Sequence, residues 1–172
     1  YYGLSIYDRE NDDLLGAKQN QEKFLELNPN TREVVIYANI LIQYGETTKA
    51  LEILSRSYKS NSNFPSDSTI GALGRTHLVL GQTDIAIDYL SKAIKINSKT
   101  ATTMAMLAVA HTMKGETNQA AAAVAEVKKL NPNATSANLN YIFKPLSASV
   151  PAYKEWYEKT YMPAYRKAGF IE

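Results

Sequence analysis

A chain of 172 residues is long enough to bury one sizeable core or to form a short solenoid of repeats. Its 19 basic and 17 acidic residues give a formal net charge of +2, which excludes the strongly basic surface that direct nucleic-acid binding requires. The sequence has no cysteine, so disulfides and cysteine-ligated metals are excluded, whereas the compartment is not fixed. We expect a cytoplasmic protein and keep the periplasm as the alternative.

Neither a membrane span nor a targeting segment is predicted. The longest apolar runs, 104–110 and 120–125, are far shorter than the roughly 20 residues that a membrane-crossing helix needs. The first residues lack an initiator methionine and a signal-peptide pattern, so we expect a fragment of a longer protein.

The first expected element is a helix over 12–27. Asp12 and Asp13 suit its N-terminus, because a carboxylate oxygen accepts hydrogen bonds from the free amide groups there. The Asn-Pro-Asn sequence at 28–30 ends the helix, since proline cannot continue it. Together with a short helix over 1–9, this element predicts a partial repeat.

Three helical hairpins are expected next. Each combines a first helix, a Gly-polar-Thr turn and a second helix, and the expected helices are 31–44 and 47–58, 67–80 and 83–96, and 101–114 and 117–130. Glycine can adopt the left-handed conformation that closes the first helix, and threonine can cap the second.

The second and third hairpins repeat each other after 34 positions. The pattern pairs Gly74 with Ala108, His77 with His111, Gly81 with Gly115, Ala86 with Ala120, Leu90 with Val124 and Ile96 with Leu130. Two extra residues before Gly81 are placed in the polar loop at 60–66. A fixed period of this length indicates a solenoid of helical hairpins.

The tail beyond Asn133 loses this period. A short helix over 136–143 and a loop over 144–150 are expected to precede a last helix over 151–168, with Pro151 in its first turn. Aromatic residues form a stripe along this last helix at Tyr153, Trp156, Tyr157, Tyr161 and Tyr165. We therefore expect the helix to cap the apolar end of the solenoid.

A second proline lies within the last helix. Pro163 is expected to kink or split the helix near Thr160, because it cannot donate a backbone hydrogen bond.

The repeated unit resembles the tetratricopeptide repeat, a helical hairpin with small or aromatic residues at set positions. The resemblance covers 31–132 well and 1–30 in part. It implies an all-α, right-handed solenoid of about four hairpins with an aromatic C-terminal capping helix, in a single domain over 1–172. The expected division is a partial first repeat at 1–30, repeats at 31–66, 67–100 and 101–134, and a C-terminal cap at 135–172.

A more specific resemblance is to the C-terminal repeat region of bacterial class III adenylate and guanylate cyclases and of winged-helix transcriptional regulators. It is carried by 27–30, the offset loop near Phe64 and Pro65, 130–133 and 166–170. This resemblance implies the regulatory end of a signalling or transcription protein. The longer, tyrosine-rich segment after the last repeat departs from it.

No catalytic, cofactor or metal site is predicted. His77 and His111 occupy equivalent places in successive repeats, so they should lie about 10 Å apart, too far to share one zinc ion. We interpret both as half-buried packing residues. Nucleophile-elbow, phosphate-loop and metal-helix signatures are missing from the sequence. We expect a non-enzymatic segment without a cofactor, and an upstream catalytic domain such as a nucleotide cyclase stays open.

The predicted binding surface is the concave face, which the first helix of each hairpin lines in tetratricopeptide-repeat proteins. Its expected lining is mostly small and apolar, with two arginines: Arg32, Val35, Asn39, Ile42, Gly71, Arg75, Leu78, Thr102, Ala105, Met106 and Val109. Such a wall suits an extended or helical peptide, whose backbone Asn39 can hydrogen-bond. The clamp that some members use for a C-terminal carboxylate is not reproduced, because Val35 stands where a lysine is needed.

Tyrosines gather toward the two ends of the chain, at Tyr1, Tyr2, Tyr7, Tyr141, Tyr153, Tyr157, Tyr161 and Tyr165. We interpret them as caps of the solenoid ends, with a homodimer contact as the alternative. The predicted function is a protein-interaction or regulatory module. A small-molecule sensor and a scaffold for an envelope or secretion assembly stay as alternatives.

Overall fold

The computed structural model describes residues 14–27, 33–61, 66–133, 139, 143–145 and 149–170, and these residues contain no strand. The repeat helices are α2 (Leu14–Leu27), α3 (Val34–Gln43), α4 (Thr47–Ser60), α5 (Asp67–Val79), α6 (Thr83–Ile96), α7 (Ala101–Lys114) and α8 (Thr117–Leu130). A C-terminal helix continues from α10 (Pro151–Trp156) through a π-helical turn, η1 (Tyr157–Tyr161), into α11 (Met162–Lys167). The predicted all-α fold is confirmed. The helices expected at 1–9 and 136–143 lie outside the described residues, apart from Leu139 and Phe143.

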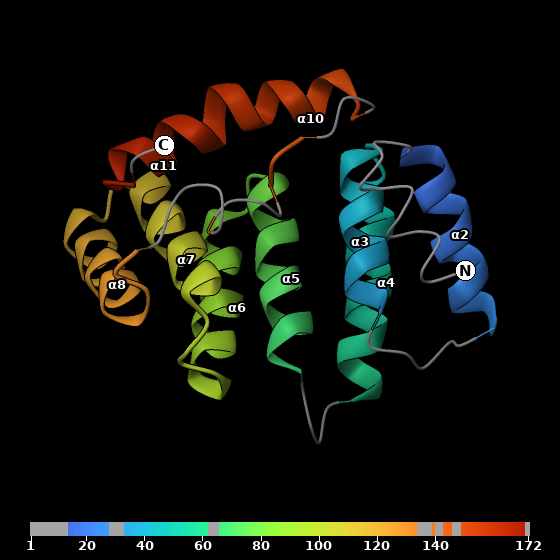
Figure 1. Cartoon of the computed structure of the whole chain (residues 1–172), viewed down its shortest axis with the longest axis horizontal. Coiled ribbons are helices and arrows are strands. Elements are labelled where there is room, and N and C mark those ends of the chain that lie inside the picture. Colours follow the sequence, from blue (N-terminus) through green and yellow to red (C-terminus); the bar gives the residue numbers. More distant parts are fainter. Residues whose placement is uncertain are drawn as a thin grey trace.

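Three helical hairpins stand side by side as a solenoid (Figure 1). Helix α3 pairs with α4, α5 with α6, and α7 with α8. The first helices form one layer, because α5 contacts both α3 and α7. Helices α5 and α7 begin 34 residues apart, as do α6 and α8, which confirms the predicted period. No helix among the described residues is both long and apolar enough to cross a membrane.

Glycines in the left-handed conformation close the turns inside the hairpins. Gly45, Gly81 and Gly115 have φ angles of +86°, +72° and +83°, as predicted. After each glycine, the backbone N–H of the next residue donates to the carbonyl five positions earlier, at 2.8 to 2.9 Å. These bonds satisfy carbonyl groups that the end of a helix otherwise leaves open.

The threonine after each turn does not cap the second helix. Thr47, Thr83 and Thr117 are the first residues of α4, α6 and α8, and no side-chain cap bond forms at any of these three helix starts. Each threonine lies one position inside its helix, where its hydroxyl cannot take the capping position. The predicted threonine caps are therefore wrong.

Two histidines form hydrogen bonds with residues of the turns that follow them. The Nδ1 of His77 lies 2.6 Å from Oε1 of Gln82, and the Nδ1 of His111 lies 2.6 Å from Oε2 of Glu116. An amide oxygen only accepts hydrogen bonds, so Nδ1 of His77 carries the proton. His77 is buried and stacks on Tyr89 with ring centroids 5.4 Å apart. Both histidines therefore contribute to packing and to turn geometry.

Gly74 has no side chain, which lets the two helices of the second hairpin approach each other closely. A Cβ at Gly74 would lie 2.7 Å from Cγ of Leu90 and 3.2 Å from the carbonyl oxygen of Ala86. Leu90 and Ala86 are fully buried. Gly71 differs, because a Cβ there would lie 3.7 Å from Oγ1 of Thr103, at an ordinary van der Waals distance. Only Gly74 of this pair is required by close packing.

The C-terminal helix crosses the row of hairpins along one edge, from α3 toward α7 (Figure 1). At its start, the N–H of Val150 donates to the carbonyl of Gln43 at 3.0 Å. At its end, α11 packs against α7. The expected C-terminal covering helix is present, but it spans the hairpins along their edge instead of lying on the last one. We call residues 149–170 the C-terminal strap.

The helix of the strap widens into a π-helical turn before Pro163. The N–H of Met162 bonds to the carbonyl of Tyr157, five residues earlier. Because proline has no N–H, the regular bond from position 163 to Lys159 cannot form. Thr160 lies within this π-helical turn, so the helix is irregular where a kink or split was expected, but it is not split and continues into α11.

Aromatic rings of the strap pack into the protein interior. Tyr161 lies 4.1 Å from Phe143 and 6.0 Å from Tyr165, and Tyr165 lies 4.7 Å from Phe170, measured between ring centroids. Tyr161 and Tyr165 are fully buried, and burial raises the pKa of Tyr161 well above its usual value. The predicted aromatic stripe is therefore part of the core.

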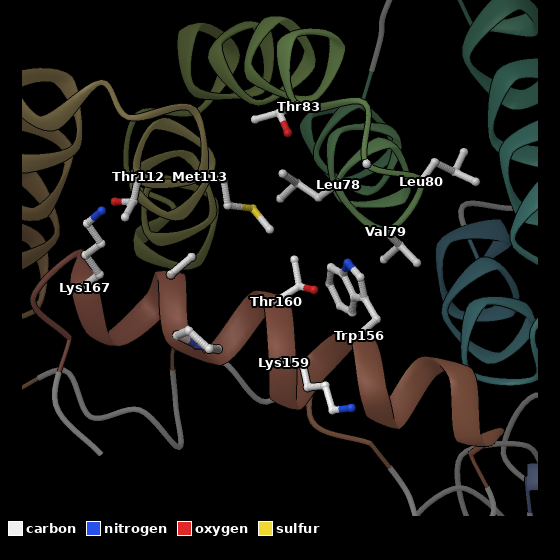
Figure 2. A pocket seen from close by; sticks show the side chains of 13 residues that line it. Leu78, Val79, Leu80, Thr83, Thr112, Met113, Trp156, Lys159, Thr160 and Lys167 are labelled. Atoms are coloured by element: carbon white, nitrogen blue, oxygen red, sulfur yellow. The ribbon is translucent and has the colours of Figure 1, made fainter.

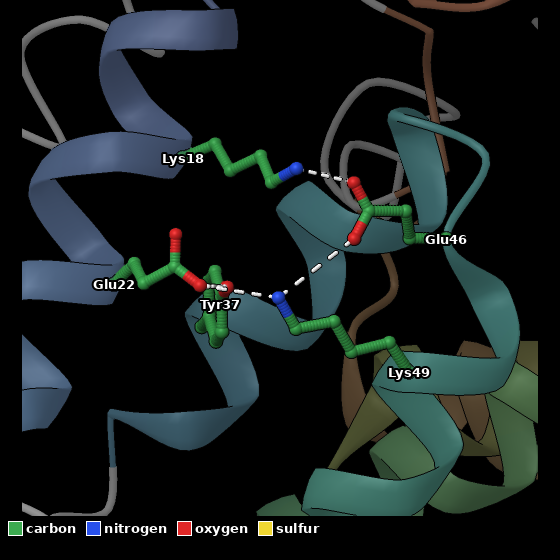
Figure 3. Close-up of polar contacts among 5 residues, drawn as sticks. All are labelled: Lys18, Glu22, Tyr37, Glu46 and Lys49. Carbon is green, nitrogen blue, oxygen red and sulfur yellow. Dashed lines mark hydrogen bonds and ion pairs between the residues drawn. The ribbon is translucent and has the colours of Figure 1, made fainter.

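A polar network attaches α2 to the first complete hairpin (Figure 3). The Nζ of Lys49 lies 3.1 Å from Oε1 of Glu22, and the Tyr37 hydroxyl donates to the same oxygen at 2.9 Å. A second ion pair joins Lys18 to Glu46. The hydrogen bond from Lys49 and, to a smaller extent, the one from Tyr37 lower the pKa of Glu22. Helix α2 is thus held to α3 and α4 by charge as well as by packing.

Candidate functional site

A groove of about 380 Å³ runs across the first helices of the hairpins. Helix α3 contributes Val35, Ile36 and Asn39, α5 contributes Asp67, Ser68, Gly71, Ala72 and Arg75, and the start of α7 contributes Thr100, Thr102, Thr103 and Met106. Gly71 and Ala72 lie in the central helix, and their small size leaves the space between the flanking helices open. The groove lies on the layer of first helices that the sequence predicted as the binding face.

The predicted groove residues divide between this surface and other places. Those that line the groove are Val35, Asn39, Gly71, Arg75, Thr102 and Met106. Ile42, Ala105 and Val109 are buried in the core, because they lie on the sides of the first helices that meet neighbouring helices. Leu78 is also buried and lines a different cleft. Arg32 lies outside the described residues.

Sequence reasoning missed half of the lining: Ile36, Asp67, Ser68, Ala72, Thr100 and Thr103. The 34-residue period contains a signal for two of them, since Ser68 is equivalent to Thr102 and Ala72 to Met106. Asp67 and Thr100 stand at helix starts, and their place at the rim depends on how neighbouring helices are offset.

Asn39 presents an unsatisfied acceptor in the wall of this groove. Its side chain is 9 % exposed, and its Oδ1 is buried without a hydrogen-bond partner among the described residues. A buried acceptor without a donor is unfavourable by roughly 1–3 kcal/mol. A ligand N–H at this point would relieve that cost.

Arg75 contributes a positive charge to the lining of the groove. It is 4 % exposed, and its guanidinium carbon lies 5.9 Å from the centre of the Phe143 ring. Burial raises the pKa of Tyr153, and the nearby charge of Arg75 opposes this rise. The Tyr153 hydroxyl donates to the carbonyl of Phe143 at 2.8 Å. Arg75 therefore lies between the groove and the C-terminal strap.

The charges around the groove are few. Asp67 at the rim accepts a hydrogen bond from the Asn97 amide at 2.8 Å, and Arg75 is the cation of the lining. Across the described part of the chain, no three histidine or carboxylate side chains come together as a metal ion would require. The arrangement offers hydrogen bonding and a shaped surface, which suit binding.

Comparisons with known proteins agree with this architecture. The family model of the tetratricopeptide repeat matches residues 68–100. A crystal structure of MamA protein has a TM-score of 0.63 at 20% identity, covering 98% of this chain and 87% of its own. A MamA structure from Desulfovibrio magneticus RS-1, which runs from residue 41 to the end, has a TM-score of 0.65 at 15% identity, covering 98% and 90%. No curated protein matches the sequence.

A further structure, a tetratricopeptide repeat protein from Parabacteroides merdae ATCC 43184, has a TM-score of 0.62 at 12% identity and covers 81% of this chain and 56% of its own. Identities this low show a shared fold and nothing finer. The chain has the fold of a tetratricopeptide-repeat solenoid, with a recognisable repeat at 68–100. Solenoids of stacked repeats present extended concave surfaces that are used for binding.

Proposed function

We propose that this chain is a protein-interaction module whose groove binds an extended peptide segment of a partner. The observation that carries the proposal is Asn39, which lines the groove and whose buried Oδ1 has no donor among the described residues. An extended peptide carries backbone N–H groups that no helix or sheet satisfies. A hydrogen bond from one such N–H to Oδ1 of Asn39 would satisfy the peptide donor and the protein acceptor together.

The rest of the lining supports an extended peptide in preference to a bulky domain. Gly71 and Ala72 leave room for a backbone to approach α5 closely. Arg75 offers a cation to a carbonyl or carboxylate, and the threonines of α7 offer hydroxyls on the opposite wall. The absence of a lysine clamp at Val35 favours an internal segment over a free C-terminus.

The experiment is a selection of peptides from a random library on the intact chain, followed by affinity measurements on variants. Ser68→Trp places a large ring at an exposed lining position, and Asn39→Leu removes the acceptor. Both should weaken the selected peptides about tenfold or more, a loss of about 1.4 kcal/mol. Asn118→Trp is the control, because Asn118 is the second residue of α8 as Ser68 is of α5, but lies outside the groove.

Two results would contradict the proposal. Selected peptides that bind Ser68→Trp as well as the Asn118→Trp control must use another surface. A library that yields no peptide specific for this chain would remove the basis for an extended ligand.

The parent protein is a separate proposal, supported by the sequence resemblance at 27–30, 130–133 and 166–170. We infer that the chain is the C-terminal regulatory region of a bacterial signalling or transcription protein, acting in the cytoplasm. The upstream reading frame tests this directly. A nucleotide-cyclase or winged-helix domain there supports the proposal, whereas a lipoprotein signal would favour a scaffold for envelope assembly.

The organisation of the chain also stays a proposal. We propose one continuous domain over 1–172 with the repeat division given above. Tyr153, Tyr161 and Tyr165 are buried in the core, so these three tyrosines offer little exposed surface for a homodimer interface. Sedimentation of the intact chain over a range of concentrations would measure its oligomeric state.

A further inference from the structure

A second cleft, of about 660 Å³, lies between the C-terminal strap and the hairpins (Figure 2). Its lining comes from the end of α5, the turn into the start of α6, the end of α7 and the strap: Leu78, Val79, Leu80, Gly81, Thr83, Thr112, Met113, Trp156, Lys159, Thr160, Pro163, Ala164 and Lys167. None of these residues lines the groove on the first helices. The strap cleft is therefore a separate site.

The apolar part of the strap cleft is built around Trp156. Its ring lies 5.9 Å from Phe143, 5.7 Å from Tyr153 and 5.5 Å from Tyr161, measured between ring centroids. These contacts fix the indole in place, and Figure 2 shows it standing up from the strap toward Leu78. A held aromatic wall needs no reorganisation when an apolar ligand binds.

The strap cleft also leaves apolar surface in contact with solvent. Leu80 at its edge is 37 % exposed, and Met113 and Val79 are only partly buried. A volume of this size falls within the range of roughly 300–1,000 Å³ that small-molecule sites occupy. The site is therefore large enough for a small organic ligand with an apolar body.

The charge of the lining has one sign. Lys159 and Lys167 are its ionisable residues, and the lining contains no carboxylate. Lys159 is paired with Glu155 at 2.8 Å, whereas Lys167 makes no ion pair with any described residue. In Figure 2, Lys167 extends toward Thr112 at one end of the strap cleft, with Trp156 toward the other end.

Another role for Lys167 competes with ligand binding. Lysines are favoured near helix C-termini, and Lys167 lies in the last turn of α11 and close to the end of α7. Part of that end is already satisfied, since the carbonyls of His111 and Thr112 accept bonds from Glu116 and Gly115. A role at a helix end explains the charge but not the aromatic wall opposite it.

We propose that the strap cleft binds an amphipathic organic anion, with the acidic group at Lys167 and the apolar body extending over Met113 toward Trp156. The ammonium group of Lys167 supplies the positive charge for the acidic group. The nearby Thr112 hydroxyl is not counted as a donor to the ligand, because it donates to the Ala108 carbonyl. Trp156 supplies the apolar surface at the far end. The ligand class is a small carboxylate or sulfonate joined to an aromatic or acyl body.

The test uses the intact chain and two matched probes. The anion 8-anilinonaphthalene-1-sulfonate and the neutral N-phenyl-1-naphthylamine share the same ring system and differ by the sulfonate. Trp156 is the single tryptophan of the chain, so energy transfer after selective excitation reports probe bound to the protein, and the variants below decide whether it occupies the strap cleft. We expect saturable transfer to the anion and binding of the neutral probe that is about fivefold weaker, near the most that an exposed ion pair commonly contributes.

Three variants locate the probe. Lys167→Gln should weaken the anion about fivefold and leave the neutral probe unchanged. Lys128→Gln is the control, because Lys128 is an exposed lysine in the last turn of α8 and lies outside the strap cleft. Thr160→Glu places a carboxylate at an exposed lining position and should abolish the saturable transfer to the anion.

The proposal is overturned if Lys167→Gln and Lys128→Gln bind the anion equally, because a helix-end role for Lys167 then suffices. It is also overturned if both probes bind with the same affinity, or if Thr160→Glu retains the energy transfer. All three variants change exposed side chains, so the folded chain can be compared directly.

Discussion

The Ser149 hydroxyl donates a hydrogen bond of 2.7 Å to Oε1 of Gln43, across 106 positions of sequence. Both side chains are buried, with Ser149 4 % and Gln43 5 % exposed. The neighbouring N–H of Val150 donates to the Gln43 carbonyl. One residue at the end of α3 therefore holds the start of the strap through its side chain and its backbone.

Replacing Gln43 should loosen the strap. Gln43→Leu removes the side-chain acceptor of the buried Ser149–Gln43 hydrogen bond, so the free energy of unfolding should fall by about 0.5–1.5 kcal/mol. Urea denaturation measures the loss, and amide hydrogen exchange should show faster exchange in α10. Gln119→Leu on the exposed face of α8 is the control and should change stability little. Equal stabilities for the two variants would contradict the role of Gln43.

Gly74 and Gly71 should respond in opposite ways to the same substitution. Gly74→Ala forces a Cβ to within 2.7 Å of Leu90 and should destabilise the protein by about 1–3 kcal/mol. Gly71→Ala meets only ordinary contacts with Thr103 and should stabilise α5 by up to about 1 kcal/mol through helix propensity. Urea denaturation of both variants checks the sign of each change, and a loss of stability in Gly71→Ala would contradict the prediction.

The helices were predictable because their signals are local. Helices α7 (Ala101–Lys114) and α8 (Thr117–Leu130) have the expected bounds. The glycine turn between them marks the end of α7 and the start of α8, and the 34-residue period transfers the other bounds from the preceding hairpin. The first complete hairpin is less regular. It has Leu41 where the others have histidine, so Glu46 has no histidine to bond and pairs with Lys18 of α2 instead. That pairing depends on tertiary structure.

The course of the strap and part of the groove lining could not be predicted either, because both depend on contacts between residues that are distant in sequence. No period or motif signals that Gln43 bonds to Ser149, and this contact takes the strap along the edge of the hairpins. In the groove, Asn39 and Arg75 were identified because they are polar residues at equivalent positions of first helices. Ile42 and Val109 were misplaced, since the sequence shows that they lie on first helices but not how far each helix is rotated toward its neighbour.

Asn39 should reveal a trade between stability and binding. Asn39→Leu removes a buried acceptor without a partner, so the free energy of unfolding should rise, by up to about 1–3 kcal/mol. The same change should weaken peptides that bind the groove. Thermal or urea unfolding measures the first effect and titration calorimetry the second. Asn118→Leu on α8 is the control for the change of residue type.

This opposition distinguishes a binding role from a structural one. If Asn39 mainly supported the fold, its replacement would lower stability, and any loss of affinity would follow from unfolding. A variant that is more stable and binds less has changed at the binding surface and has not lost affinity through unfolding. A fall in stability would therefore contradict the assignment of the unpaired Oδ1.

The attachment of α2 should depend on pH through Glu22. Lys49 and Tyr37 lower the pKa of Glu22 in the folded protein below the value of about 4.3 for an unfolded chain. The stabilisation is therefore fully present above about pH 4.3 and is lost as the pH falls through the lowered folded value. Because the Glu22 side chain is 44% exposed, solvent screening limits the contribution to about 0.5 kcal/mol.

The difference between the wild type and Glu22→Gln isolates this contribution from other carboxylates. Urea denaturation of both proteins between neutral pH and pH 3 should give a more stable wild type at neutral pH and a difference that shrinks in acid. Glu52→Gln is the control, because Glu52 pairs with Arg56 within one exposed helix face and holds no second element. A difference for Glu22→Gln that stays constant with pH would mean that packing, and not charge, attaches α2.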